Sequence, residues 1–324
     1  MKLMPAVAVV AGMASLAAAP LACGQAYPVK PVRVVVPWPP GASSNDIVGR
    51  VLAHRLSENL GQQFVVENRA GASSIIGTEI VAKSAPDDYT LLVTSATHVG
   101  NTALYKKLPY DAQKDFIGVT ALARQVGILV LHPSVPARTV KEFVALARAR
   151  PGEVIYASTG SGSFTHLQMA LFNQMTQTRM LHVAYKGGGP AVIALVSGET
   201  HAFITGIAAV LPHIKANRLR ALGVTSAERI TQVPDIPTIA EAGVSGYEFT
   251  AWIGSFVPAA TPRPIVEKLN LEIRKALEHP DVAKNLSSQT LDPMPMTLEQ
   301  FAARLRSDYE KYEKLVRISG ARIE

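Results

Sequence analysis

The sequence predicts an α/β fold built from two domains. Short apolar segments rich in β-branched residues, typical of buried strands, alternate with longer segments whose apolar residues recur at helical spacing. The chain has 324 residues, 48% of them hydrophobic, which is long enough for two domains with large cores. Small polar and glycine-rich loops follow several predicted strands, at the position where open α/β sheets bind ligands.

Residues 1–26 have the features of a secretory signal peptide. Lys2 supplies a positive charge, and residues 7–19 form an apolar run too short to cross a bilayer as a helix. Small residues then offer cleavage contexts up to Ala26, and no later segment has about 18 uninterrupted apolar residues. We therefore expect a mature chain that is soluble outside the cytoplasm.

The one cysteine of the chain, Cys23, lies in this segment. Cleavage after Ala26 leaves a mature chain without cysteine, which excludes disulfides, metal–thiolate sites and a cysteine nucleophile. The alternative is lipidation of Cys23, although Pro20-Leu21-Ala22 matches a lipobox poorly.

The formal charge is +7, or +6 once Lys2 is removed with the signal peptide (7 − 1). Basic residues are scattered and form no run of five, so the sequence does not predict nucleic-acid binding. A solvated basic surface explains this charge, and steering of anionic ligands is a functional alternative.

The first predicted unit of the mature chain is a strand, a small loop and a helix. Residues 32–36 form the strand, and Pro37-Trp38-Pro39-Pro40-Gly41 ends it. The polar residues 43–46 supply an N-cap for a helix that ends at Gly61. Such a helix N-terminus presents free backbone N–H groups and the positive end of a dipole, so it suits an anion. An ordinary capped turn explains the same residues.

The same alternation continues to the end of the chain. Further strands are predicted at residues 63–68, 91–93, 127–131, 154–157, 181–185, 219–225 and 248–257. Helices are predicted at residues 75–82, from the Thr139-x-x-Glu142 capping box to Arg150, after Ser163, from Pro190 to Gly198, from Pro264 to Ala276, and from the Thr297-x-x-Gln300 capping box to about Ser319.

Polar loops between these elements are candidate binding segments, but none matches a catalytic or cofactor motif. The polar residues 94–98 follow the third strand, and glycine-rich loops occupy residues 158–163 and 186–189. Neither glycine loop completes the GxGxxG or P-loop pattern, and HExxH, GxSxG and EF-hand patterns do not occur. We therefore expect no cofactor, no metal and no enzymatic activity, a secreted Ser/His hydrolase being the weaker alternative.

His166 is the histidine best placed to touch a ligand. It lies one turn into the helix that follows the loop 158–163. A structural role as a hydrogen-bonding histidine fits this position as well.

The chain resembles the Bug family, the extracytoplasmic solute receptors associated with tripartite tricarboxylate transporters. The resemblance covers the whole mature chain, and it is the ordered combination of short motifs that is specific. The matching motifs are Tyr27-Pro28-Val29-Lys30-Pro31, Pro37-Trp38-Pro39-Pro40-Gly41, Asn45-Asp46, Val66-Glu67-Asn68-Arg69-Ala70-Gly71-Ala72, Gly77-Thr78, Tyr89-Thr90-Leu91-Leu92, Leu104-Tyr105-Lys106-Lys107-Leu108-Pro109-Tyr110-Asp111, Lys114-Asp115-Phe116, Tyr185-Lys186-Gly187, Leu211-Pro212-His213-Ile214, Leu219-Arg220-Ala221-Leu222, Ile236-Pro237-Thr238 and Glu241-Ala242-Gly243.

This resemblance implies a type 2 periplasmic-binding-protein fold, in which two α/β lobes close over a ligand in the cleft between them. Residues 27–124 are then the first part of lobe one, 125–224 are lobe two, and 225–324 are the second part of lobe one. The chain would cross between the lobes near Arg124-Gln125-Val126 and return near Val224-Thr225.

The resemblance also implies which loops hold a ligand carboxylate. Carried onto this sequence, the residues of lobe one are Ser43, Ser44, Asn45, Asp46, Ser95, Ala96, Thr97 and His98. Those of lobe two are Ser161, Gly162, Ser163, Tyr185, Lys186 and Gly187. Hydroxyl and backbone N–H groups would orient the ligand, and closure of the lobes would exclude water.

Three departures from the family pattern bear on the ligand. Ala42-Ser43-Ser44 stands where many relatives have a second glycine and one residue fewer, so the first loop can differ in shape. Asp88 replaces a usual glycine, which alters a surface turn. Thr205 lies near a position where many relatives carry an acidic residue that pairs with a ligand ammonium. We therefore expect an aliphatic or aromatic mono- or dicarboxylate without a cationic amine.

The resemblance implies a periplasmic receptor that delivers a small organic carboxylate to membrane permease subunits of a tripartite tricarboxylate transporter. The alternative is an orphan sensor of the same fold that feeds a signalling system. Neighbouring genes for a transporter or for a sensor kinase would separate the two. We expect a monomer that binds no nucleic acid.

Overall fold

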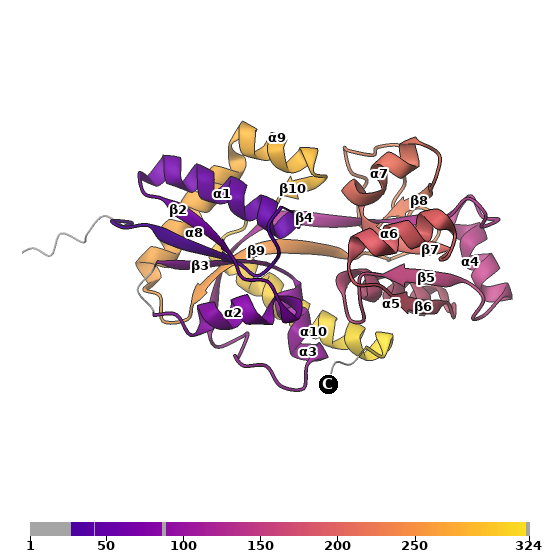
Figure 1. Ribbon diagram of the computed structural model, residues 1–324, viewed down its shortest axis with the longest axis horizontal. Coiled ribbons are helices and arrows are strands. Elements are labelled where there is room, and N and C mark those ends of the chain that lie inside the picture. Colours follow the sequence, from indigo (N-terminus) through magenta and orange to yellow (C-terminus); the bar gives the residue numbers. More distant parts are fainter. Residues whose placement is uncertain (1–26, 42, 86–88, 322–324) are drawn as a thin grey trace, which may run out of the picture.

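Figure 1 shows a computed structural model of the chain, which describes residues 27–41, 43–85 and 89–321. The predicted signal peptide with Cys23, residue Ala42 and the predicted turn at residues 86–88 lie outside the described residues. No helix in the described ranges combines the length and the apolar character needed to cross a membrane.

Lobe one is built on three parallel strands. β1 pairs with β2 and with β3, and Val34 lies opposite Val66 on one side and Leu91 on the other. Helices cover both faces of these strands (Figure 1). The elements of lobe one are β1 (Val32–Val36), α1 (Ser44–Leu60), β2 (Phe64–Asn68), the 3-10 turn η1 (Ala72–Ser74), α2 (Ile75–Ala82), β3 (Thr90–Ser95), α3 (Thr97–Leu104), α8 (Arg263–Glu278), α9 (Pro280–Ser288), β10 (Leu291–Pro293) and α10 (Leu298–Ser319).

Lobe two has the same plan. β5 pairs in parallel with β6 and with β7, and β7 and β8 are antiparallel to β4. The elements of lobe two are α4 (Val140–Ala149), β5 (Ile155–Ser158), α5 (Phe164–Thr176), β6 (Leu181–Ala184), α6 (Gly188–Ser197), β7 (Ala202–Gly206), α7 (Ile207–Lys215) and β8 (Arg220–Val224). The helix predicted to open with Pro190 begins two residues earlier, at Gly188.

Two long antiparallel strands, β4 (Phe116–Leu131) and β9 (Thr250–Pro258), connect the lobes. In Figure 1 both strands run through the middle of the molecule. β4 pairs with β9 from Phe116 to Val126, and from Gly127 onward it pairs with β7 instead. One strand therefore belongs to the sheets of both lobes, which makes a single ten-stranded sheet.

Residues 226–249 pack against lobe two. Ile230 and Val233 share a core with Ile128 of β4 and Phe203 of β7. The segment ends where Phe249 N donates to Thr225 O at 2.8 Å. We therefore propose that the chain returns to lobe one at the start of β9, later than the expected crossing near residues 224 and 225.

Helix α1 illustrates why the predicted elements form where they do. Ser43 caps its N-terminus by accepting a hydrogen bond from Asp46 N, and Gly61 ends it in the left-handed conformation at φ 67°. Leu52 and Leu56 are fully buried on one face of the helix. Each such leucine contributes about 1.5–3 kcal/mol through burial of apolar surface. The helix is therefore fixed to the sheet with its N-terminus at the carboxyl end of β1.

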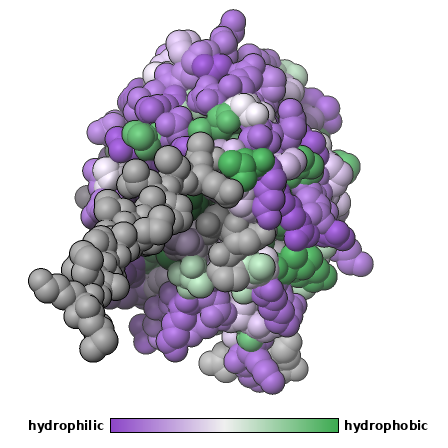
Figure 2. All heavy atoms as spheres, turned by 90° about the vertical axis from the view of Figure 1, so that its left-hand side faces the viewer, coloured by the Kyte–Doolittle hydropathy of each residue, from purple (hydrophilic) through white to green (hydrophobic). Residues whose placement is uncertain are grey.

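The outer surface of lobe one is mainly polar. Figure 2 views this end of the molecule and shows hydrophilic side chains with scattered hydrophobic ones between them. Isolated apolar residues of this kind are ordinary on soluble proteins.

Candidate functional site

The segments that follow β3 in lobe one and β5 in lobe two meet at a small cavity between the lobes. Its volume is about 30 Å³. The residues that line it come from both lobes, from both crossing strands and from α10. They are Ser95, Ala96, Thr97, Gly100, Leu104, Gln125, Gly162, Phe164, Leu167, Ala251 and Tyr312.

The two lobes touch each other at this cavity. A Cβ atom on Gly162 of lobe two would lie 2.4 Å from Leu104 Cδ2 of lobe one, so a larger residue there would require the side chain of Leu104 to shift. Gly162 also has φ 74°, a conformation that other residues adopt at a cost. A cavity of this volume holds about one water molecule. A dicarboxylate therefore needs the lobes to move apart before it can enter.

The first loop of lobe one surrounds the N-terminus of α1. Ser43 caps the helix and is half-buried, whereas Asn45 is buried and its Oδ1 has no hydrogen-bond partner among the described residues. Ser44 is half-buried as the first residue of the helix. The first N–H groups of a helix have no partner within the helix, so this end of α1 can accept an anion.

The carboxylate of Asp46 is already occupied by the protein. Its Oδ2 accepts hydrogen bonds from Gly41 N at 2.7 Å and Arg50 Nε at 2.9 Å, and its Oδ1 accepts one from Asn68 Nδ2 at 2.7 Å. Burial opposes ionisation, but the bonds from Arg50, Gly41 and Asn68 outweigh it and hold the pKa of Asp46 below its usual value. Asp46 therefore shapes the loop, and a negative side chain repels a ligand carboxylate.

The loop after β3 divides between the cavity and the core. Ser95, Ala96 and Thr97 line the cavity, and Ser95 Oγ donates to Thr97 Oγ1 at 3.0 Å. His98 instead is fully buried, with its ring 4.7 Å from the ring of Phe256. Burial lowers the pKa of His98 to about 4, so the ring is neutral. The structure therefore places His98 in the core of lobe one and not in the ligand wall.

The loop 158–163 of lobe two is closely tied to the helix that follows it. Ser163 caps α5 by accepting a hydrogen bond from His166 N, and its Oγ lies 3.0 Å from Thr165 Oγ1. Gly162 N donates to His166 Nδ1 at 3.0 Å. Ser161 is exposed. The loop thus reaches the cavity through Gly162, while His166 supports it from behind.

The remaining predicted residues of lobe two lie at the carboxyl ends of β6 and β7. Tyr185 OH donates to Glu199 Oε1 at 2.7 Å, and burial followed by this carboxylate raises the pKa of Tyr185 to about 12. Lys186 is exposed, and Gly187 precedes α6 at φ 103°. Thr205 is buried in β7 opposite Ile128. None of these four residues lines the cavity in this closed arrangement.

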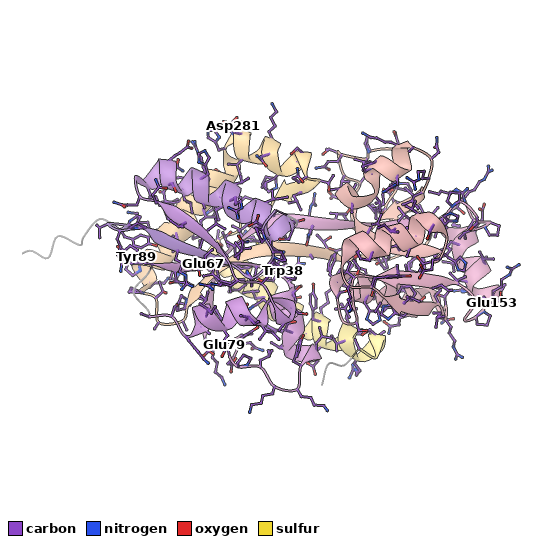
Figure 3. All side chains as sticks on the ribbon, viewed as in Figure 1. Trp38, Glu67, Glu79, Tyr89, Glu153 and Asp281 are labelled. Atoms are coloured by element: carbon purple, nitrogen blue, oxygen red, sulfur yellow. The ribbon has the colours of Figure 1, made fainter. Side chains whose placement is uncertain are left out.

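Several residues at the meeting of the lobes were not predicted as ligand contacts, among them Gln125, Tyr312 and Trp38 (Figure 3). Gln125 and Tyr312 line the cavity from β4 and α10. Trp38 lies on the side of lobe one that faces lobe two, whereas Glu153 marks the far end of lobe two (Figure 3). The indole Nε1 of Trp38 is buried and has no acceptor among the described residues. The Pro37-Trp38-Pro39 motif signalled Trp38, but no local pattern marks Gln125 or Tyr312.

Metal binding finds no support in the geometry. Within residues 27–41, 43–85 and 89–321, no three His, Cys, Asp or Glu side chains come together in a way that could hold an ion. The residues that line the cavity offer hydrogen bonds from hydroxyl, amide and backbone N–H groups.

Comparison with known proteins identifies related chains over almost the whole length. The family described as "Tripartite tricarboxylate transporter family receptor" matches residues 48–320. The UPF0065 protein in the tcbD-tcbE intergenic region of Pseudomonas sp. (strain P51) is 39% identical over 292 residues, which cover 90% of this chain and 87% of the relative. Protein BugT of Bordetella pertussis is 36% identical over 301 residues, which cover 92% of each chain.

Solved structures of similar proteins have the same fold. Rpa4515 of R. palustris, solved with adipate, has a TM-score of 0.80 at 33% identity, with 92% of this chain and all of the other covered. MatC (Rpa3494) of Rhodopseudomonas palustris, solved with bound malate, has a TM-score of 0.76 at 32% identity, with 90% of this chain and all of the other covered. The predicted type 2 periplasmic-binding-protein fold with two α/β lobes is therefore confirmed.

Proposed function

Because the chain belongs to the tripartite tricarboxylate transporter receptor family, and is thus a solute-binding receptor and not an enzyme, we propose that it captures a small organic carboxylate between its lobes. On this proposal it works in the periplasm, after removal of residues 1–26, and delivers the ligand to permease subunits of such a transporter. The similar protein BugD is described as a periplasmic binding protein, and Rpa4515 and MatC were solved with adipate and malate.

The observation that carries the proposal is that polar loops from both lobes line one cavity. Ser95 and Thr97 of lobe one face Gly162 of lobe two across the cavity. The N–H of Gly162 is bonded to His166, so a carboxylate held there would accept hydrogen bonds from the hydroxyls of lobe one and from the neighbouring Ser161 of lobe two, and would so stabilise the closed arrangement. The N-terminus of α1 and the unpartnered N–H of Trp38 supply further donors at the same side of lobe one. We retain Ser43, Ser44 and Asn45 as proposed ligand contacts for this reason.

We further propose that the ligand carries no cationic amine. The residues that line the cavity include no Asp or Glu. The nearby carboxylate of Asp46 is taken up by three donors, and Thr205 is a neutral residue. An ammonium group brought into this site would lose its water without gaining an anionic partner, which is costly.

Thermal-shift measurements with matched ligand pairs test whether the protein binds a small carboxylate and whether that ligand lacks a cationic amine. Succinate and aspartate differ by one ammonium group, and so do glutarate and glutamate; adipate, malate and benzoate extend the series. A ligand at 100 times its Kd stabilises the folded protein by about 2.7 kcal/mol, which raises Tm measurably. We expect at least one plain carboxylate to raise Tm and the amino acids to leave it unchanged. A larger shift with aspartate or glutamate would overturn the amine-free ligand, and no shift with any carboxylate would count against the receptor function.

A further inference from the structure

Two stacked histidines lie behind the loop that lobe two presents to the cleft. The rings of His166 in α5 and His182 in β6 are parallel within 7°, with their centroids 3.8 Å apart. Each ring is bonded to the loop. Gly162 N donates to His166 Nδ1 at 3.0 Å, and Ser158 Oγ lies 2.6 Å from His182 Nε2. The histidine pair therefore holds residues 158–163 in place through these two hydrogen bonds.

These bonds fix the two glycines that give the loop its shape. Gly160 and Gly162 both have positive φ angles, 138° and 74°. Gly160 is held by Ser158, because its N donates to Ser158 Oγ at 3.2 Å and its O lies 3.1 Å from the same hydroxyl. Gly162 is held by His166. The backbone that closes against Leu104 of lobe one thus depends on the histidines.

The bond from Gly162 requires one protonation state. A neutral histidine accepts a hydrogen bond at Nδ1 only when that nitrogen has no proton, whereas both nitrogens of a charged histidine are donors. If His166 were protonated, its Nδ1–H group and the N–H of Gly162 would point at each other as two donors without an acceptor. Protonation would also place a charge 3.8 Å from the ring of His182. We propose that His166 is a positioning residue, whose unprotonated Nδ1 holds Gly162 in the geometry that binds the ligand.

The surroundings of the pair oppose protonation of both rings. Burial, followed by the charge of His182, lowers the pKa of His166 to about 4, and burial also lowers the pKa of His182. Tyr156 stacks on His182 at 5.0 Å. A groove lies over the pair, and it is lined by both histidines, Tyr156, Arg179 and residues 318–321 among others. Among the described residues that line it, Arg179 is the one charged side chain and Tyr156 is the one titratable side chain besides the histidines. Residues 318–321, at the end of α10 and just after it, have no charged side chain. No carboxylate there stabilises a protonated histidine.

The inference rests on the proposed function, because the loop affects binding only if the cleft holds the ligand. Its first test therefore needs no ligand. Hydrogen–deuterium exchange of the Gly162 amide is measured by NMR in the mature protein and expressed as a protection factor. Three variants are compared with the wild type. His166→Asn keeps an acceptor near the place of Nδ1 but does not titrate, His166→Leu has no acceptor, and His54→Asn removes an exposed histidine of α1 as a control.

At pH 7 we expect the Gly162 amide to have the same protection factor in the wild type, His166→Asn and His54→Asn. In His166→Leu we expect this protection factor to be at least 10-fold lower. Between pH 7 and pH 3.5 the protection factor of Gly162 should fall at least 3-fold in the wild type and in His54→Asn, because His166, with a pKa of about 4, gains its proton in this range. In His166→Asn the protection factor should not change. If His166→Leu does not fold, the comparison of His166→Asn with the wild type decides. Equal pH dependence in these two proteins would overturn the inference, as would full protection in a folded His166→Leu.

A second test measures the affinity for adipate by calorimetry at the same two pH values. Protonation of adipate affects all variants alike, so the quantity compared is the ratio of the wild-type Kd to the His166→Asn Kd. We expect this ratio to rise at least 3-fold at pH 3.5, and an unchanged ratio would overturn the inference. If the wild type does not bind adipate at pH 7, that result counts against the proposed ligand class, and the exchange measurement alone decides the role of His166.

Discussion

In the proposed anion site at the N-terminus of α1, the carboxylate of Asp46 shapes the loop and is itself occupied by protein donors. It lies in the first turn of α1, where a negative charge is favoured by the helix dipole. Its bonds to Gly41 and Asn68 connect the loop after β1 to the end of β2. The carboxylate thus orders the loop, and the remaining N–H groups of the helix end are left to a ligand.

Replacement of Asp46 by Asn should destabilise the protein. The amide cannot accept from Gly41, Arg50 and Asn68 together, so at pH 7 we expect a loss of about 1–3 kcal/mol in the free energy of unfolding. Because the pKa of Asp46 is lowered in the folded state, its contribution is complete above the unfolded value of 3.8 and is lost as the pH falls through the lower folded value. The wild type and Asp46→Asn should therefore converge in acid.

Urea unfolding between pH 7 and pH 3 measures this difference. The control is Asp235→Asn, since Asp235 is exposed and surface substitutions of this kind change stability by less than about 0.5 kcal/mol. A difference between wild type and Asp46→Asn that is absent at pH 7, or that stays constant to pH 3, would refute the role given to Asp46.

Sequence patterns identify polar residues near a cleft but not the direction in which they point. Ser95 and Thr97 line the cavity, whereas His98 turns into the core one residue later. The reason is that α3 begins at Thr97, so successive side chains lie about 100° apart around a helix instead of continuing along a loop. Tyr185 points to Glu199 because its hydroxyl donates to that carboxylate in the folded chain. The burial of His98 depends on aromatic residues distant in the sequence, so no local sequence pattern predicts it.

At the scale of elements, helix α10 is fastened to the crossing strand β9. Trp252 Nε1 donates to Asp308 Oδ2 at 2.7 Å, and Arg304 Nε donates to the same oxygen at 2.8 Å. Arg304 also donates to Thr250 O at 3.0 Å, where β9 begins. A capping box of Thr297 and Gln300 fixes the start of the helix. One buried carboxylate thus joins the last helix to the connection between the lobes.

Asp308→Ala should cost about 3–5 kcal/mol in the free energy of unfolding, because it leaves the N–H of Trp252 and the charge of Arg304 without their buried partner. Urea unfolding followed by tryptophan fluorescence measures the loss, and the emission of buried Trp252 should also change. The control on the same helix is Glu313→Ala, whose side chain is exposed. Equal stability of Asp308→Ala and Glu313→Ala would contradict the fastening of α10 to β9.

Periodicity predicts elements with strong local signals and misses those set by the surroundings. The strand at 32–36, the cap at Ser43 and the capping box at Thr297 are confirmed. Helices α3, α7 and α9 and strand β7 were not predicted. α3 follows β3 after a single residue, and α7 begins directly after β7, so no separate loop marks either boundary. The pairing of β4 with both lobes also escapes prediction, since it joins residues that lie 71 (131 to 202) to 142 (116 to 258) positions apart in the sequence.

At the scale of the whole molecule, the lobes meet in a nearly closed arrangement. Gly162 lies against Leu104, the cavity holds about one water molecule, and α10 contacts both α3 of lobe one and α5 of lobe two. We propose that the lobes separate about the crossing strands β4 and β9 to admit the ligand. A ligand that bonds to both lobes then favours their closure, because it interacts more strongly with that state.

The central claim is that one carboxylate group is held by both lobes at once. A crystal structure of the protein grown with the carboxylate that gives the largest thermal shift tests it most directly. We predict a ligand carboxylate within about 3.2 Å of donors from lobe one, at residues 43–45 or 95–97, and from lobe two, at residues 161–163. A ligand that contacts one lobe only, or that lies outside the space between Thr97 and Gly162, would contradict the claim.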